Sequence, residues 1–248
     1  MIKLLSILLV SLVLNIESHA SIAFDSSSEP AYNDEATFNA LNGGSGFNAW
    51  SVGGNGGSYI NARTLGSSGF RLWADAGMFV VAERSLSSAL ETGQSFSVNI
   101  GHFGGNNGEL GLSLMSGISS VFNLNLVAGS SYWRAWDGGS SYDLNDVSGM
   151  ANYHTTDNDL AVFTFTFNGG NSYSFSLEDS LGNGYFASDY TAINDITSID
   201  GISFYNNGQG GGKNFYFDQL SIIPEPATVG LLAFVGSSLI VARRRFGT

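Results

Sequence analysis

The chain of 248 residues has no cysteine, only three prolines and few basic residues. Without cysteine, neither a disulfide framework nor thiol chemistry is open to it. Its nine lysines and arginines are outnumbered by 21 aspartates and glutamates, giving a net charge of −12. This charge argues against binding of nucleic acid or anionic lipid by the folded part. Long apolar runs are absent except near the two ends, so contact with a membrane is expected only there.

The N-terminus has the three parts of a secretory signal peptide. Lys3 supplies a positive charge, residues 4–14 form a short apolar core, and Ser18-His19-Ala20 places small residues where signal peptidase reads them. We expect residues 1–20 to be a signal peptide cleaved after Ala20, with cleavage after Ala23 as a second choice. The alternative is an uncleaved N-terminal anchor.

The C-terminus carries a proline-containing triplet, an apolar segment and a basic cluster, in that order. Pro224, Glu225 and Pro226 cannot continue a sheet or a helix, so the folded domain is expected to span residues 21–223. Residues 227–242 carry no charge and are expected to form one transmembrane helix. The segment is short, since a bilayer span usually takes about 20 apolar residues, but local thinning of the bilayer accommodates such a shortfall. The basic cluster is expected on the cytoplasmic side; it consists of Arg243, Arg244 and Arg245.

This order of features resembles the sorting signal of the PEP-CTERM family of exported bacterial proteins, which a membrane protease called exosortase is thought to process. The resemblance covers residues 223–245, and the whole signal is expected to occupy residues 224–248. It implies exosortase and the membrane as partners and a single-pass precursor in the inner membrane. After cleavage near Pro224, the mature protein would pass to the cell surface or become extracellular. The alternative is an apolar C-terminal strand or core helix with a basic tip.

Apolar and small polar residues alternate with period two through much of residues 21–223. This alternation is typical of β-strands with one buried and one wet face. Turns rich in Gly and Asn separate the segments, and residues 168–171 (Asn-Gly-Gly-Asn) form the clearest hairpin signal. We predict an all-β domain, a two-sheet antiparallel β-sandwich or jelly roll of about a dozen strands. The side chains expected to face inward are Phe96, Val98, Leu112, Leu124, Phe163, Phe165, Phe175 and Phe217.

A second resemblance concerns the body of the protein. Its motifs occur in the order 69–74, 82–86, 90–96, 202–207 and 214–222. Their order is similar to that in exported bacterial β-sandwich proteins of the concanavalin-A-like kind, which often carry the same C-terminal tail. The resemblance implies the fold alone. That family includes sugar binders, and it assigns no functional residue to this chain.

The body shows no recognisable catalytic set. His102 and His154 are not at metal-ligand spacing, and neither lies in a nucleophile-elbow context. Glu178 and Asp179 are adjacent, so in a strand they point to opposite faces and cannot act as a glycosidase pair. We therefore expect no catalytic residues and no enzymatic activity.

The segment 132–137 is the best candidate for ligand binding. In a strand, Tyr132, Arg134 and Trp136 share one face, while Trp133 points into the core. An aromatic–Arg–aromatic row on an outer sheet face is suited to stacking on sugar rings. The alternative is that Trp136 covers the sheet edge and Arg134 pairs locally. The tryptophans at 50 and 73 are expected in the core.

We expect no cofactor. The alternative is a calcium site formed by acidic residues in the loop that follows. Asp137, Asp143 and Asp146 are close in sequence, and calcium takes six to eight oxygen ligands. Asx turns explain the same residues without a metal.

These features favour a non-enzymatic cell-surface or extracellular-matrix protein of bacteria. A carbohydrate-binding module for exopolysaccharide is the second hypothesis, and a polysaccharide hydrolase or lyase is the third. A clustered aromatic platform on one outer face would distinguish the second from the first. The third needs converging carboxylates or a His–Tyr–Arg group in a cleft.

Overall fold

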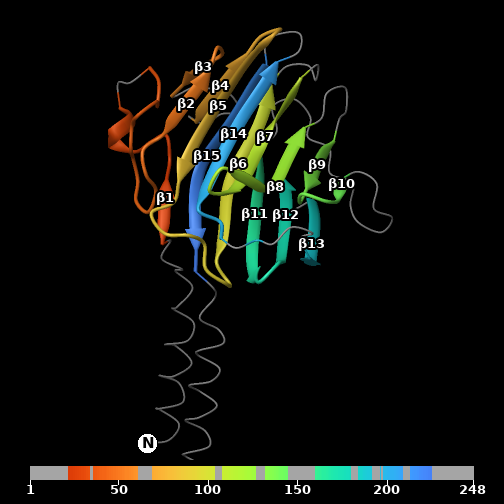
Figure 1. The fold of residues 1–248 in the computed structure, drawn as a ribbon. Coiled ribbons are helices and arrows are strands. Elements are labelled where there is room, and N and C mark those ends of the chain that lie inside the picture. Colours follow the sequence, from red (N-terminus) through yellow and green to blue (C-terminus); the bar gives the residue numbers. More distant parts are fainter. Residues whose placement is uncertain are drawn as a thin grey trace, which may run out of the picture.

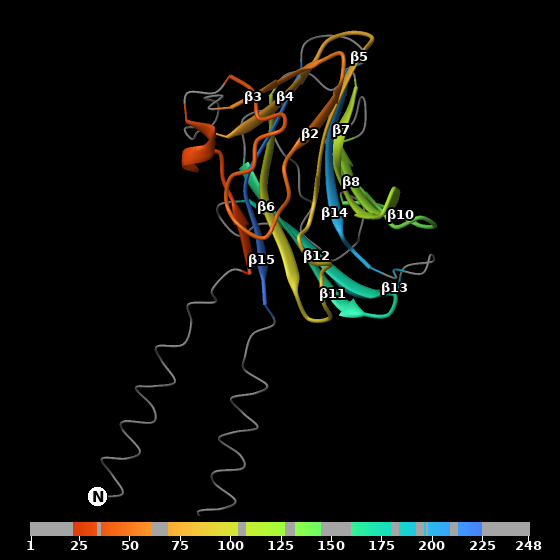
Figure 2. The ribbon, with the colours of Figure 1, turned by 60° about the vertical axis from the view of Figure 1, so that its left-hand side comes forward.

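The computed structural model describes residues 22–33, 36–60, 69–103, 108–126, 132–144, 160–179, 184–191, 196, 198–208 and 213–224. Within them the chain forms fifteen β-strands and one short 3-10 helix, η1 (Pro30–Tyr32), but no α-helix. The strands build two sheets that lie face to face (Figure 1; Figure 2). The predicted two-sheet antiparallel sandwich is confirmed.

The first sheet, called sheet I here, has the order β13-β12-β11-β6-β15-β4-β3, and β1 also pairs with β15. Every pairing in it is antiparallel. Its strands are β13 (Gly184–Thr191), β12 (Ser172–Asp179), β11 (Leu160–Gly169), β6 (Ser95–Phe103), β15 (Lys213–Ile223), β4 (Phe70–Ala74), β3 (Gly57–Tyr59) and β1 (Ala23–Asp25).

The second sheet, called sheet II here, has the order β10-β9-β8-β7-β14-β5-β2 and is also antiparallel throughout. Its strands are β10 (Ser141–Asp143), β9 (Trp133–Trp136), β8 (Ser119–Leu126), β7 (Glu109–Ser116), β14 (Gly201–Gly208), β5 (Met78–Ser85) and β2 (Ser51–Gly54). The strand β14 lies between β7 and β5, so a late segment of the chain completes the middle of this sheet.

The core fills the space between the two sheets. All eight side chains predicted to face inward are buried. Aromatic rings join the sheets directly: Phe204 of β14 stacks on Phe217 of β15 with ring centroids 4.0 Å apart, and Phe122 of β8 stacks on Phe163 of β11 at 5.8 Å. Because such rings bury large apolar areas, this aromatic core compensates for the absence of disulfides.

A local prediction about a turn is also confirmed. The hairpin between β11 and β12 turns at Gly169 and Gly170, which both have positive φ, a conformation that other residues adopt only at a cost. The last strand, β15, ends at Ile223, directly before Pro224. Strand β1 pairs with the end of β15, so Ala23 lies opposite Ile222 and the first and last strands lie side by side.

One prediction about the core was wrong. Trp50 is buried as expected, but Trp73 is only partly buried. In β4 the alternation sends Leu72 and Ala74 inward, so Trp73 between them points to the outer face of sheet I.

The described residues contain no helix long and apolar enough to cross a bilayer. Three sequence features lie outside them: the predicted signal peptide at 1–20, the apolar segment 227–242 and the arginine cluster at 243–245.

Candidate functional site

A continuous row of side chains crosses the outer face of sheet II. Cross-strand pairing sets six residues side by side on six neighbouring strands, from β9 to β2. In order they are Trp136, Asn123, Ser113, Ser203, Glu83 and Ser51, called the cross-strand row below. Their inward-facing neighbours fill the core, so period two places the whole row on the opposite, outer face.

The row is most buried at its middle and most exposed at its ends. Trp136 is 39% exposed at one end, and Glu83 and Ser51 are exposed at the other. Ser113 and Ser203 at the centre are buried. The amide of Asn123 donates to the Ser113 hydroxyl over 2.9 Å, while the Ser203 hydroxyl donates to Glu83 over 3.4 Å. These bonds hold short polar side chains in fixed orientations.

Polar side chains on the neighbouring register positions widen the face. The Tyr205 hydroxyl donates to Asn123 over 3.2 Å, and burial raises the pKa of this phenol, so it stays a neutral donor. Asn125 donates its amide to Glu109. The side-chain oxygen of Asn125 is buried and, among the described residues, accepts no hydrogen bond. A buried acceptor without a partner is costly, so this atom suits a buried water molecule.

The predicted binding residues lie at the β9 end of this face. Arg134 and Trp136 point outward, and Trp133 and Ala135 are buried, in accord with the predicted alternation. Arg134 pairs with Asp143 of β10 at 2.5 Å, which is the local pairing that the alternative expected. This bond raises the pKa of Arg134, and a side-chain hydrogen bond with Tyr132 acts in the same direction. Tyr132, Arg134 and Trp136 are thus brought together.

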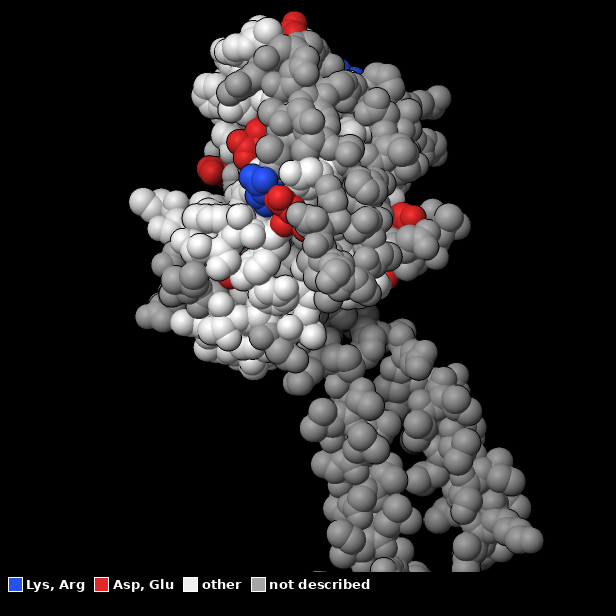
Figure 3. Space-filling view, turned by 90° about the vertical axis from the view of Figure 1, so that its right-hand side faces the viewer, with Lys and Arg blue, Asp and Glu red and all other residues white. Residues whose placement is uncertain are grey.

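A groove of about 590 Å³ opens at the other end of the row. Glu83 and Ser51 belong to both the row and the groove, and Met115, Asp200 and Ile118 line it further along. The view from the side of β10 shows basic and acidic side chains in contact, while most other described atoms belong to uncharged residues (Figure 3). The outer face of sheet II thus has a groove beside one end of the row and an aromatic ring at the other.

The structure counts against the calcium alternative as far as it describes the loop. Asp137 is buried, and its carboxylate accepts hydrogen bonds from Tyr173 at 2.8 Å and from the backbone amide of Ser140 at 2.9 Å. Asp143 is paired with Arg134, and Asp146 lies outside the described residues. Among the described residues, no group of three or more acidic or histidine side chains is arranged to hold a metal ion.

The remaining candidates from the sequence lie elsewhere. His102 is buried and its ring lies 6.4 Å from that of Trp133, while His154 is outside the described residues. Glu178 lies on sheet I, where the Ser176 hydroxyl donates to it over 3.0 Å. Of the sorting triplet, only Pro224 is described, as the residue after β15.

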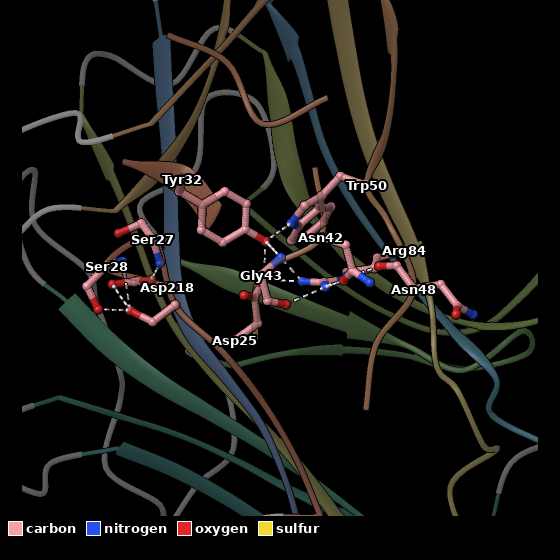
Figure 4. A network of polar contacts seen from close by, with 11 residues as sticks. Asp25, Ser27, Ser28, Tyr32, Asn42, Gly43, Asn48, Trp50, Arg84 and Asp218 are labelled. Carbon is pink, nitrogen blue, oxygen red and sulfur yellow. Dashed lines mark hydrogen bonds and ion pairs between the residues drawn. The ribbon is translucent and has the colours of Figure 1, made fainter. Parts of the chain in front are cut away.

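A second polar cluster is buried inside the fold, away from this face (Figure 4). Its centre is the ion pair between Arg84 of β5 and Asp25 of β1, both fully buried. The Tyr32 hydroxyl donates to Asp25 over 2.9 Å and accepts the indole N–H of Trp50 over 3.1 Å. We call this set the buried network. It ties the segment from β1 to Trp50 to the strands of both sheets.

Arg84 is satisfied on every side by groups of this segment. It donates to the backbone oxygens of Asn48 at 2.5 Å and Gly43 at 2.9 Å. Its guanidinium also lies 4.9 Å from the ring centroid of Phe47 and 5.0 Å from that of Trp50. Carbonyl oxygens and aromatic faces both stabilise a cation, so Arg84 does not depend on Asp25 alone.

Sequence reasoning missed most of the cross-strand row and the buried network. Asn123, Ser113 and Ser203 occupy the polar positions of alternating strands, so period two predicts that they face outward but not that they meet. Arg84 also lies in an alternating segment, at a position that should face the core. An arginine occupies such a position only when its charge is paired. The sequence therefore did carry a signal for the buried network, namely the charge of Arg84 at a position that should face the core.

The chain matches no protein-family model and no curated protein sequence. Solved structures of similar fold include a carbohydrate esterase from the Shiga toxin-encoding bacteriophage phi24B, with a TM-score of 0.52 and 14% identity over 83% of this chain and 99% of that chain. A structure described with endo-acting O-glycanases of human gut bacteria has a TM-score of 0.52 and 10% identity over the same shares. A sialidase aligns with 71% of this chain over 17% of its own length, at 9% identity and a TM-score of 0.49. At such identities the esterase and the O-glycanase structure show that the chain shares their β-sandwich fold.

Proposed function

We propose that the sandwich is a non-enzymatic carbohydrate-binding module of an exported bacterial surface protein, and that it binds polysaccharide on the outer face of sheet II. The observation that carries this proposal is the cross-strand row, a line of short polar side chains with a half-exposed tryptophan at one end. The fold is also that of a carbohydrate esterase and of a structure described with O-glycanases, which supports a carbohydrate ligand.

The chemistry of the row suits sugars. A sugar ring presents hydroxyls around its edge and C–H groups on its faces. The amide of Asn123 and the hydroxyl of Tyr205 supply donors and acceptors for the edge, and the indole of Trp136 supplies a flat surface for a face. No histidine lies on the described part of this face, so an acid–base pair with histidine has no support there.

A glycan array tests this function. Full-length protein in a non-glycosidic detergent should bind one or more polysaccharides, and Trp136→Ala and Asn123→Ala should lose that binding. Phe186→Ala is the matched control, because Phe186 is 51% exposed on the outer face of sheet I, where no binding is proposed. Binding that all three variants retain, or an array on which no polysaccharide binds, would contradict the proposal. Release of reducing ends from a bound polymer would favour a hydrolase.

The proposed route to the surface rests on the two ends of the sequence. The signal peptide would export the chain, residues 227–242 would hold it in the inner membrane, and exosortase would cut near Pro224. Replacing Pro224, Glu225 and Pro226 by alanine should leave a full-length species in the inner membrane. Mass spectrometry of the C-terminal peptide shows whether the tail has been cleaved. If the mature wild-type protein keeps Arg243 to Arg245, the tail is only an anchor.

A further inference from the structure

The length of the cross-strand row limits the kind of ligand that fills it. The row spans six strands, from β9 to β2. Neighbouring strands lie about 4.8 Å apart, so the row is roughly 24 Å long. A single sugar would occupy only a small part of it. The row therefore matches a run of several sugar units that lies across the strands.

The ends of the row also argue for a chain rather than a terminal sugar. At one end, Ser51 on the edge strand β2 is exposed, and Glu83 and Ser51 also line the groove of about 590 Å³, which runs beside the row toward Met115 and Ile118. At the β9 end, Trp136 is 39% exposed and offers its ring to solvent. Because both ends of the row are exposed, a polymer bound along it can continue past either end, as an internal segment does and a chain terminus need not.

The charges on the face select against anionic polymers. Arg134, the basic side chain at the β9 end among the described residues, is already paired with Asp143. Glu83 lies in the row, and Glu109 lies beside it and holds Asn125. The net charge of −12 adds a repulsion at long range. An uncharged polymer avoids both penalties and still finds hydrogen-bond partners at Asn123, Ser113 and Ser203.

We infer that the outer face of sheet II binds an internal segment of an uncharged polysaccharide, laid across the strands, and discriminates against polyuronates. This inference rests on the proposed carbohydrate-binding function and names its substrate class. Trp136 stacks on one sugar unit, and the polar side chains of the row bind the hydroxyls of the following units.

The first experiment compares polymers and chain lengths with the full-length protein in a non-glycosidic detergent. An array carrying uncharged polysaccharides and polyuronates should show binding only to uncharged ones. Oligosaccharides prepared from the tightest-binding polymer, from disaccharide to octasaccharide, are then titrated calorimetrically. Affinity should rise by about tenfold or more between the shortest and the longest, since each added contact adds free energy. A polyuronate as the tightest binder, or equal affinity for all lengths, overturns the inference and leaves the proposed function standing.

The second experiment locates the chain on the row. Trp136→Ala should weaken every oligosaccharide, whereas Glu83→Ala should weaken only those long enough to reach the β5 end. Phe186→Ala is again the control on the opposite sheet, and circular dichroism checks that each variant keeps its β fold. If Glu83→Ala weakens short and long oligosaccharides equally, the ligand does not run along the row. If no oligosaccharide or polymer binds wild-type protein at all, the proposed function fails, and the inference fails with it.

Discussion

The Arg84–Asp25 pair and the Arg134–Asp143 pair have the same chemistry but opposite surroundings. The side chains of the first pair are fully buried, whereas those of the second are 34% and 32% exposed. The first joins β5 to β1 across the sandwich, and the second joins the adjacent strands β9 and β10. One pair therefore holds the fold together, and the other remains within reach of a ligand.

The comparison shows how burial decides what an ion pair does. A buried pair costs desolvation when it forms, but removing one partner leaves the other uncompensated, which is strongly destabilising. A half-exposed pair contributes little, because water replaces either partner at small cost. Stability should therefore respond to changes at Arg84 and Asp25, and binding should respond to changes near Arg134.

The largest effect is expected from Arg84→Ala. This change removes the hydrogen bonds that hold the segment from β1 to Trp50 and leaves Asp25 without its cation. The free energy of unfolding should fall by about 3–5 kcal/mol. Urea unfolding followed by circular dichroism measures it. Arg134→Ala is the matched control and should cost no more than about 1 kcal/mol. Equal losses in the two variants would contradict the comparison.

The next effect is a dependence of stability on pH. Burial raises the pKa of Asp25 from 3.8 to about 6, against the charge of Arg84, which lowers it. One carboxylate oxygen of Asp25 has no hydrogen-bond partner among the described residues, so a proton on it breaks no existing hydrogen bond. The folded state then binds a proton that the unfolded state has released. This contribution to stability is present below pH 3.8 and is lost as the pH rises through about 6.

Urea unfolding between pH 3.8 and 6 checks this sign. The free energy of unfolding of wild-type protein should fall with rising pH relative to that of Asp25→Asn, which cannot titrate. Burial also raises the pKa of Asp218, so part of the slope should persist in the variant. Parallel curves for the two proteins would show that Asp25 does not carry the effect.

A smaller effect, confined to binding, is expected from Trp136→Ala. The ring is half-exposed, so its loss should change the free energy of unfolding by less than about 1 kcal/mol. Polysaccharide affinity should fall by about tenfold, because a stacked aromatic is commonly a dominant contact. Calorimetric titration beside urea unfolding separates the two. A large loss of stability would show that Trp136 supports the fold instead.

The smallest effect is expected from Asp143→Asn, which frees Arg134 from its partner. Stability should change by less than about 1 kcal/mol, as for other exposed pairs. Because an unpaired arginine attracts carboxylates, affinity for oligouronates should increase a few fold while affinity for uncharged oligosaccharides stays the same. Titration with both classes at low and moderate salt tests this. An unchanged preference would show that Arg134 does not contribute to selectivity.

Much of the fold could be predicted because its signals are local. Period-two alternation indicated that Phe163 and Phe165 face inward, and the pair Gly169-Gly170 indicated the hairpin that follows them. Trp73 was misplaced because its size suggested the core, while the phase of its own strand sends it outward. The candidate site was reached only at the β9 end, where Arg134 and Trp136 lie on a single strand.

The sequence by itself determined which side chains of most strands face the core. Only the tertiary structure decided that Ser203 lies beside Ser113 and Glu83, and that Arg84 meets Asp25. The physical reason is the distance along the chain over which each kind of signal acts. Alternation is a property of neighbouring residues, whereas the register between β14, β7 and β5 depends on hydrogen bonds between segments far apart in the chain. A one-residue shift in that register would dismantle the cross-strand row without changing a single residue.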